Sequence, residues 1–120
     1  MAVLRVSQVL SLGLKYAGAN LQRYDKSRRF NKWVQRFKSC YGLHPLVCTV
    51  LWCDLKNHGI DTEHNLERFF MSLYWMKNYD AESVLAVIYN LDEETVRVWC
   101  WYYSECLQEL SYTKVNTQRK

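Results

Sequence analysis

Apolar residues recur along this chain with the period of an α-helix. Between residues 27 and 42, Phe30, Trp33, Val34 and Phe37 occupy positions i, i+3, i+4 and i+7, which form one stripe along a helix. Gly42 follows, a residue type that often closes a helix in the left-handed conformation. A second helix is predicted to start at Pro45, because proline suits a first helical turn, and to end before the turn at 57–59.

Residues 65–78 are predicted to form a third helix that is apolar on more than one face, and we expect it at the centre of the core. A short helix is expected over 81–89, with Asp80 as its cap. Asn90 then stands where a tight turn needs positive φ, which Asn tolerates better than most residues.

The last predicted helix, 92–111, is capped by Asp92 and has Glu93 and Glu94 in its first turn, where the helix dipole favours acids. A single inward stripe follows at helical spacing: Val96, Trp99, Cys100, Tyr103, Leu107 and Leu110. Two helices joined by so short a turn must cross steeply, as in a helix-turn-helix.

The residues around this turn fit that motif. Ala86 is small where the two helices approach most closely, Leu85 and Tyr89 are expected to point inward, and Leu91 is expected to plug the turn. A helical hairpin without any role in DNA binding would have the same pattern, since three-helix cores recur in many proteins.

The sequence therefore predicts an all-α fold: a compact bundle of about five helices that ends in a tri-helical helix-turn-helix. One Pro and four Gly in 120 residues are too few for the many turns of a sandwich or barrel. The helix-turn-helix domain is expected over 25–112 and a basic tail over 113–120. Residues 1–24 are expected to be an extra, marginal helix or a flexible segment.

Charge is unevenly distributed. Sixteen Lys and Arg against twelve Asp and Glu give a net charge of +4, and residues 23–38 hold seven of the basic residues and a single acid, Asp25. This run is either a solvated helix face or a surface for an anionic partner, and charge alone does not separate the two.

The five cysteines are odd in number and lie among apolar residues, which is typical of reduced thiols in an intracellular protein. Six candidate zinc ligands lie close together in the sequence: Cys40, His44, Cys48, Cys53, His58 and His64. Structural zinc sites usually pair ligands two to four residues apart across a turn, and this chain has no CxxC, so packing is favoured over metal binding. No cofactor is expected.

A catalytic role is not expected either. The chain has no nucleophile–base pair, phosphate loop or paired carboxylate motif, so neither an enzyme activity nor a small-molecule substrate is predicted. The apolar run Val3–Leu14 is too short and too interrupted to span a bilayer, and no membrane association is expected.

Three segments carry a resemblance to a known family: RRFNKWVQRFKSCYGLHPLVCTVLW (28–52), RFFMSLYWMKNYDAESVLAVIYNLDEETVRVWCWYY (68–103) and ELSYTKV (109–115). In this order they resemble the N-terminal helix-turn-helix region of Harbinger-like DDE-superfamily transposases. Lys77 matches the lysine that ends the family's third helix, and Trp99 and Trp101 match the aromatic pair on its last helix.

The resemblance implies binding to duplex DNA, with transposon ends as the target and the nucleus as the location. Two departures limit it. The family's recognition helix is often basic at its start, where this chain has Asp92, Glu93 and Glu94. The three-carboxylate catalytic domain would need roughly 100–200 further residues, so no strand transfer or cleavage is expected of this chain.

A helix-turn-helix of this kind is expected to dock on duplex DNA with its last helix in the major groove and the N-terminal half of that helix against the bases. Candidate base contacts are Arg97, Glu93, Glu94, Val98 and Trp101. Arg97 is the favoured one, because a guanidinium can bond guanine O6 and N7 together. The two glutamates either accept from cytosine or cap the helix, and Trp101 is either a groove contact or a packed aromatic.

Candidate phosphate contacts lie on two other helices: Lys77, Asn78, Arg28, Arg29, Lys32 and Arg36. Such contacts position a protein on DNA without reading its sequence. The competing interpretation is a non-catalytic protein-interaction module derived from a transposase fragment, whose partner is a full-length transposase or a second copy of the chain. The acidic start of the last helix favours this interpretation, and the basic run opposes it.

Overall fold

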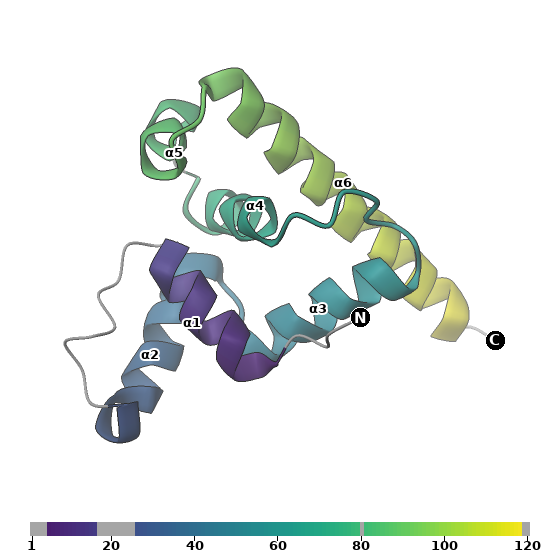
Figure 1. The fold of residues 1–120 in the computed structure, drawn as a ribbon. Coiled ribbons are helices and arrows are strands. Elements are labelled where there is room, and N and C mark those ends of the chain that lie inside the picture. The colour runs from purple at the N-terminus through teal and green to yellow at the C-terminus, as the bar shows by residue number, and fades with distance from the viewer. Residues whose placement is uncertain (1–4, 17–25, 80, 119–120) are drawn as a thin grey trace.

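Six α-helices make up the described part of the chain. The computed structural model describes residues 5–16, 26–79 and 81–118, with side chains at 5–16, 32–79 and 81–113. The helices are α1 (Val6–Tyr16), α2 (Lys26–Tyr41), α3 (Pro45–Asn57), α4 (Leu66–Asn78), α5 (Glu82–Tyr89) and α6 (Glu93–Gln118). The predicted all-α bundle, with an additional N-terminal helix, is confirmed (Figure 1).

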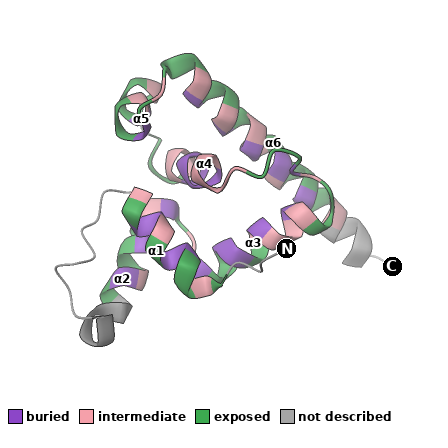
Figure 2. Ribbon diagram, in the orientation of Figure 1, coloured by how far each residue is buried: buried purple, intermediate pink, exposed green. Residues whose placement is uncertain are grey.

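Helix α4 is the central element, as its apolar pattern predicted. It packs against α1, α2, α5 and α6, and Phe69, Phe70, Met71 and Leu73 are all buried. Figure 2 shows buried residues concentrated on α4 and on the faces of the helices that turn toward it. Because α4 buries more than one face, it joins the α1–α2 side of the bundle to the α5–α6 side.

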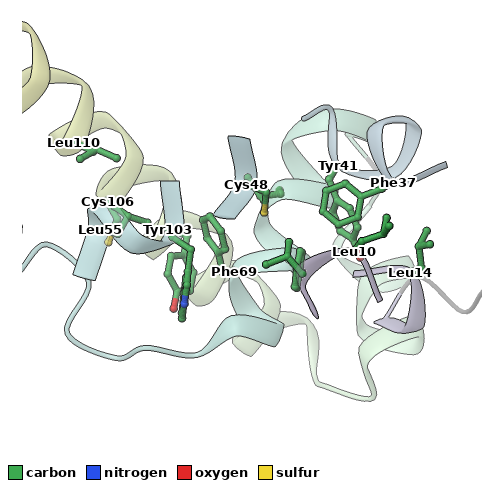
Figure 3. Close-up of a cluster of buried hydrophobic side chains, with 14 of the residues drawn as sticks. Leu10, Leu14, Phe37, Tyr41, Cys48, Leu55, Phe69, Tyr103, Cys106 and Leu110 are labelled. Atoms are coloured by element: carbon green, nitrogen blue, oxygen red, sulfur yellow. The ribbon is translucent and has the colours of Figure 1, made fainter. Parts of the chain in front are cut away.

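The larger core cluster is built mainly from aromatic rings. Phe37, Tyr41 and Phe70 pack together with ring centroids 4.7–5.9 Å apart. A second aromatic group joins Trp52 and Phe69 to Tyr103 on α6, with centroids 5.2–6.5 Å apart. Figure 3 shows these side chains meeting between helices that are far apart in sequence. Full burial of a large apolar side chain stabilises a fold by about 1.5–3 kcal/mol, so this cluster supplies much of the driving force.

Helix α1 lies within the sequence expected to be marginal or flexible, yet Val9, Leu10 and Leu14 are buried in the core. Its close approach to α2 depends on Gly13, where a Cβ would lie 2.3 Å from Phe37 Cε2. The Tyr41 hydroxyl also donates a hydrogen bond to the Gly13 carbonyl. Gly13 therefore leaves room for Phe37 and supplies the carbonyl for Tyr41, and both contacts hold α1 against α2.

Helix α6 continues beyond the expected end at residue 111. It reaches Gln118 and so covers most of the segment expected to be a basic tail. No Gly or Pro follows Leu110 to stop the helix. Its inward stripe lies as predicted, with Val96, Cys100, Tyr103 and Leu110 buried and Trp99 and Leu107 packed at the edge of the core.

Candidate nucleic-acid interface

The α5–turn–α6 unit is a helix-turn-helix built on α4. Leu85 and Tyr89 are buried with Met71 and Val96, and Ala86 and Leu91 pack against them. The inward positions on α5, the turn and α6 were predicted, whereas Met71 of α4 was not. Helices α4, α5 and α6 thus form a small shared core.

The turn itself is set by Asn90. This residue has φ 55° and ψ 53°, the left-handed conformation that the sequence predicted, and the Leu91 N–H donates to the Ala86 carbonyl at 2.9 Å. Asp92 precedes α6, and its carboxylate accepts a hydrogen bond from the Thr95 hydroxyl. Asp80, the predicted cap of α5, lies outside the described residues. The N-cap position is Ala81, which makes no side-chain capping bond.

The predicted base contacts all lie on the outer side of α6. Glu93, Glu94 and Arg97 are exposed, as are Val98 and Trp101, with 60% and 55% of their surfaces accessible. Trp101 also packs against Trp75 of α4, with ring centroids 5.8 Å apart. It is therefore a packed aromatic with an accessible face, and both interpretations of this residue remain open.

Arg97 forms a two-pronged ion pair with Glu82 of α5. Its Nη2 lies 2.7 Å from Glu82 Oε2, and its Nε lies 3.0 and 3.1 Å from the two carboxylate oxygens. The hydrogen bonds from Arg97 lower the pKa of Glu82, and the carboxylate raises the pKa of Arg97 in turn. Glu82 thus engages two of the five guanidinium N–H groups of Arg97, and the Nη1 protons and the second Nη2 proton make no bond with this carboxylate. The sequence did not predict this pair.

Two of the predicted phosphate contacts lie at the end of α4, and their surroundings differ. Lys77 is exposed. Asn78 uses its side-chain amide nitrogen to bond the carbonyls of Cys40 at 2.8 Å and Tyr74 at 3.0 Å. An amide carries two protons, so both are engaged and Asn78 has none left for a phosphate. Its role in the described fold is to tie the end of α4 to the end of α2.

The other predicted phosphate contacts belong to α2. Lys32, Arg36 and Lys38 are exposed on α2, whereas Trp33 and Phe37 of the same helix are buried. No ion pair involves these three cations among the residues whose side chains are described. Arg28 and Arg29 lie on the backbone of α2, but their side chains are outside the described residues.

Charge is divided between the two ends of the sequence. Residues 1–57 hold ten Lys and Arg and two acids, a net charge of +8, whereas residues 58–120 hold six Lys and Arg and ten acids, a net charge of −4. The described part of 5–53 contains no acid at all. Helices α1 and α2 thus form the basic part of the fold, and α5 and α6 the acidic part.

A buried carboxylate that no sequence pattern revealed fixes α6 to the α3–α4 loop. Asp61 is 1% exposed and accepts hydrogen bonds from the hydroxyls of Tyr102 at 2.9 Å and Tyr103 at 3.2 Å. It also accepts from the backbone N–H groups of Glu63 and His64, both at 3.0 Å. Because all these bonds are internal, Asp61 positions α6 and offers no free oxygen for chemistry.

The cysteines are free thiols packed in or against the core. Burial raises the pKa of Cys48 to about 12 and that of Cys100 to about 11, so both stay protonated near neutral pH. Among the residues that the structure describes, no three His, Cys, Asp or Glu side chains gather as metal ligands would. The described helices also include none long and apolar enough to cross a membrane.

Comparison with known proteins found no match for this chain. No family model matches this chain, and neither a curated protein nor a solved structure matches it.

Proposed function

We propose that this chain is a DNA-binding module, without enzymatic activity of its own, that holds the duplex mainly by its phosphate backbone. The observation that carries this proposal is the division of charge. Helix α2 presents Lys32, Arg36 and Lys38, and the described sequence contains no acidic residue before Asp54. Several exposed cations on one helix, with no acid in the surrounding described sequence, are typical of a nucleic-acid-binding surface. The resemblance to transposase helix-turn-helix regions supports the same role, on transposon ends and in the nucleus.

In this proposal the backbone grip on α2 carries the affinity and α6 contributes the sequence preference. The acids at 92–94 would repel phosphates near the start of α6, so α6 is not expected to add non-specific affinity. Arg97 can read a guanine either with the N–H groups that Glu82 does not engage or by releasing Glu82. Release would replace one set of hydrogen bonds with another, which limits the net gain.

The α2 grip is tested with the double variant K32Q/R36Q. Both side chains are exposed on the outer side of α2, so the substitutions remove charge and leave the core intact. We expect the variant to bind random duplex DNA more weakly at low salt, by fluorescence anisotropy. Lys15→Gln is the matched control, an exposed lysine on α1 that lies outside the proposed grip. Equal binding by wild type and K32Q/R36Q would contradict the proposal.

The contribution of α6 is tested separately with Arg97→Ala. If Arg97 reads a base, this variant loses preference at one position of a selected site, at a cost of about 1–3 kcal/mol, and keeps its affinity for random duplex. If the sequence preference of Arg97→Ala is unchanged, Arg97 does not read a base, and the proposed phosphate contacts on α2 are unaffected.

A protein-interaction module is the second candidate, and one observation favours it. The exposed surface of α5 is apolar, with Val84, Val87 and Ile88 all accessible, and Arg97 beside it is already paired. Such a surface suits a protein better than a phosphate backbone. The K32Q/R36Q experiment separates the candidates, because a module that binds only proteins shows no duplex affinity in the wild type.

A further inference from the structure

Helix α5 has an apolar surface on both of its sides. Leu85 and Tyr89 fill the core, while the opposite side exposes Val84, Val87 and Ile88, with 46%, 82% and 46% of their surfaces accessible. We call these three residues the α5 patch. Figure 2 shows the exposed side of α5 at the edge of the fold. A helix that is apolar all round is normally covered on all sides, so this side is incomplete in a single copy.

The composition of the α5 patch argues against a purely structural role. All three residues are β-branched, and such side chains lose χ1 freedom in a helix and lower its propensity. An exposed helical position that only had to stabilise α5 would favour Ala, Glu, Lys or Gln. The α5 patch therefore lowers the stability of the isolated helix and exposes apolar surface to water. Both costs are offset only when another apolar surface packs on the patch.

A second patch of the same kind lies on α3. Leu46, Val47 and Val50 are exposed there, with 53%, 45% and 46% of their surfaces accessible. We call these residues the α3 patch. Like the α5 patch, it places three apolar side chains within one arc of a single helix, because positions i, i+1 and i+4 share a face. Figure 1 shows α3 and α5 in separate parts of the fold, with α4 between them.

The two patches have opposite electrostatic surroundings. The α5 patch lies on a helix that starts with Glu82 and is followed by the three acids at 92–94. The α3 patch follows α2, whose described charged residues, Lys32, Arg36 and Lys38, are all basic. Two α5 patches brought together would oppose like charges, whereas an α5 patch on an α3 patch would bring opposite charges together.

We infer that the chain associates with itself head to tail, with the α5 patch of one copy packed on the α3 patch of the next. This inference does not depend on DNA binding and goes beyond the proposed function. Two different surfaces meet in such a contact, so each copy keeps one free patch and association continues into a ring or an open chain. Three side chains on each side make a smaller contact than a standard interface of about 800 Å² per partner, so the association is weak and depends on concentration.

The inference is tested by sedimentation velocity without DNA, from about 10 µM to about 500 µM, a range suited to a weak contact. Two variants each disable one patch: Val87→Gln on α5 and Val50→Gln on α3. Both positions are exposed, and Gln is a better helix former than Val, so both variants are expected to fold. Tyr112→Gln is the control, because Tyr112 is 65% exposed on α6 and outside both patches.

We expect the wild type and Tyr112→Gln to sediment as species that grow with concentration, and each patch variant alone to remain a monomer. An equimolar mixture of Val87→Gln and Val50→Gln is expected to form dimers and nothing larger, because only one intact α5 patch and one intact α3 patch can meet. A wild type that stays monomeric throughout would overturn the inference. So would a Val50→Gln variant that still dimerises alone, which would mean that like patches pair.

Discussion

Arg97 of α6 and Glu82 of α5 are joined across the helix-turn-helix by hydrogen bonds from two guanidinium nitrogens to both carboxylate oxygens. The pair lies on the surface, 15 residues apart in sequence, and it links the two helices next to their shared core. Arg97 is therefore a brace between α5 and α6 in the unbound chain. A DNA contact that uses its Nε proton or the engaged Nη2 proton competes with this brace.

The brace makes a prediction about the titration of Glu82. Because Arg97 lowers the pKa of Glu82 in the folded chain, the pair stabilises the fold above the unfolded pKa of about 4.3, and this contribution is lost as pH falls through the lower folded value. We expect NMR titration to give Glu82 a pKa below the ordinary glutamate value of about 4.3. In Arg97→Ala the value for Glu82 should rise to the ordinary range. An ordinary value in the wild type would mean that the brace is not formed in solution.

The turn between α5 and α6 predicts opposite effects for two substitutions of Asn90. Its φ of 55° is open to Gly and tolerated by Asn, but a β-branched residue is strained there. We expect Asn90→Val to lower the free energy of unfolding by about 1–2 kcal/mol in urea denaturation, while Asn90→Gly matches or exceeds the wild type. Equal losses for both variants would show that the Asn side chain, and not its backbone conformation, sets the turn.

The docking of α1 rests on the absence of a side chain at Gly13. An added Cβ would meet Phe37 at 2.3 Å, and Phe37 is fully buried and unable to move freely. We expect Gly13→Ala to destabilise the fold by about 1–3 kcal/mol, although Ala is the better helix former. Ser11→Ala, an exposed position of the same helix, is the control and should be neutral or slightly stabilising. If Gly13→Ala were neutral, α1 would not be docked in solution as described.

The Asp61 carboxylate holds the loop before α4 against α6. In Asp61→Ala, the Tyr102 hydroxyl and the backbone N–H groups of Glu63 and His64 lose the carboxylate that accepts from them, and the Tyr103 hydroxyl keeps only the Asn65 carbonyl. We expect a loss of about 1–3 kcal/mol in the free energy of unfolding. Tyr102→Phe removes only the more exposed hydroxyl and should cost less. A loss as large in Tyr102→Phe would assign the stabilisation to Tyr102 and not to the buried carboxylate.

Local features of this fold could be predicted from the sequence because they depend on neighbouring residues. The left-handed residues Gly42 and Asn90, the Pro45 start of α3 and the inward stripe of α6 all follow from spacing and backbone preference. The inward position of Leu85 in the core between α5 and α6 was predicted from the same kind of spacing. These are signals that a single helix or turn contains within itself.

The features that the sequence did not predict depend on how distant elements cross. Glu82 and Arg97 each look like solvated helix residues until α5 and α6 are placed together. Asp61 is one acid in a loop, and only the packing of α6 makes it buried. Ser7, Gln8 and Ser11 interrupt the apolar run of α1, so the sequence made that helix look marginal, whereas its docking depends on the fit of Gly13 against Phe37. In each case the missing information was the geometry between elements.

The salt dependence of duplex binding tests the central claim most directly. Each phosphate neutralised by a Lys or Arg adds about −0.9 to the slope of log affinity against log salt concentration. With Lys32, Arg36 and Lys38 as the grip, we expect a slope of about −3 for the wild type, and a slope shallower by about 2 for K32Q/R36Q. A flat response, or no anisotropy change at low salt, would contradict DNA binding by the α2 surface and leave protein interaction as the function to pursue.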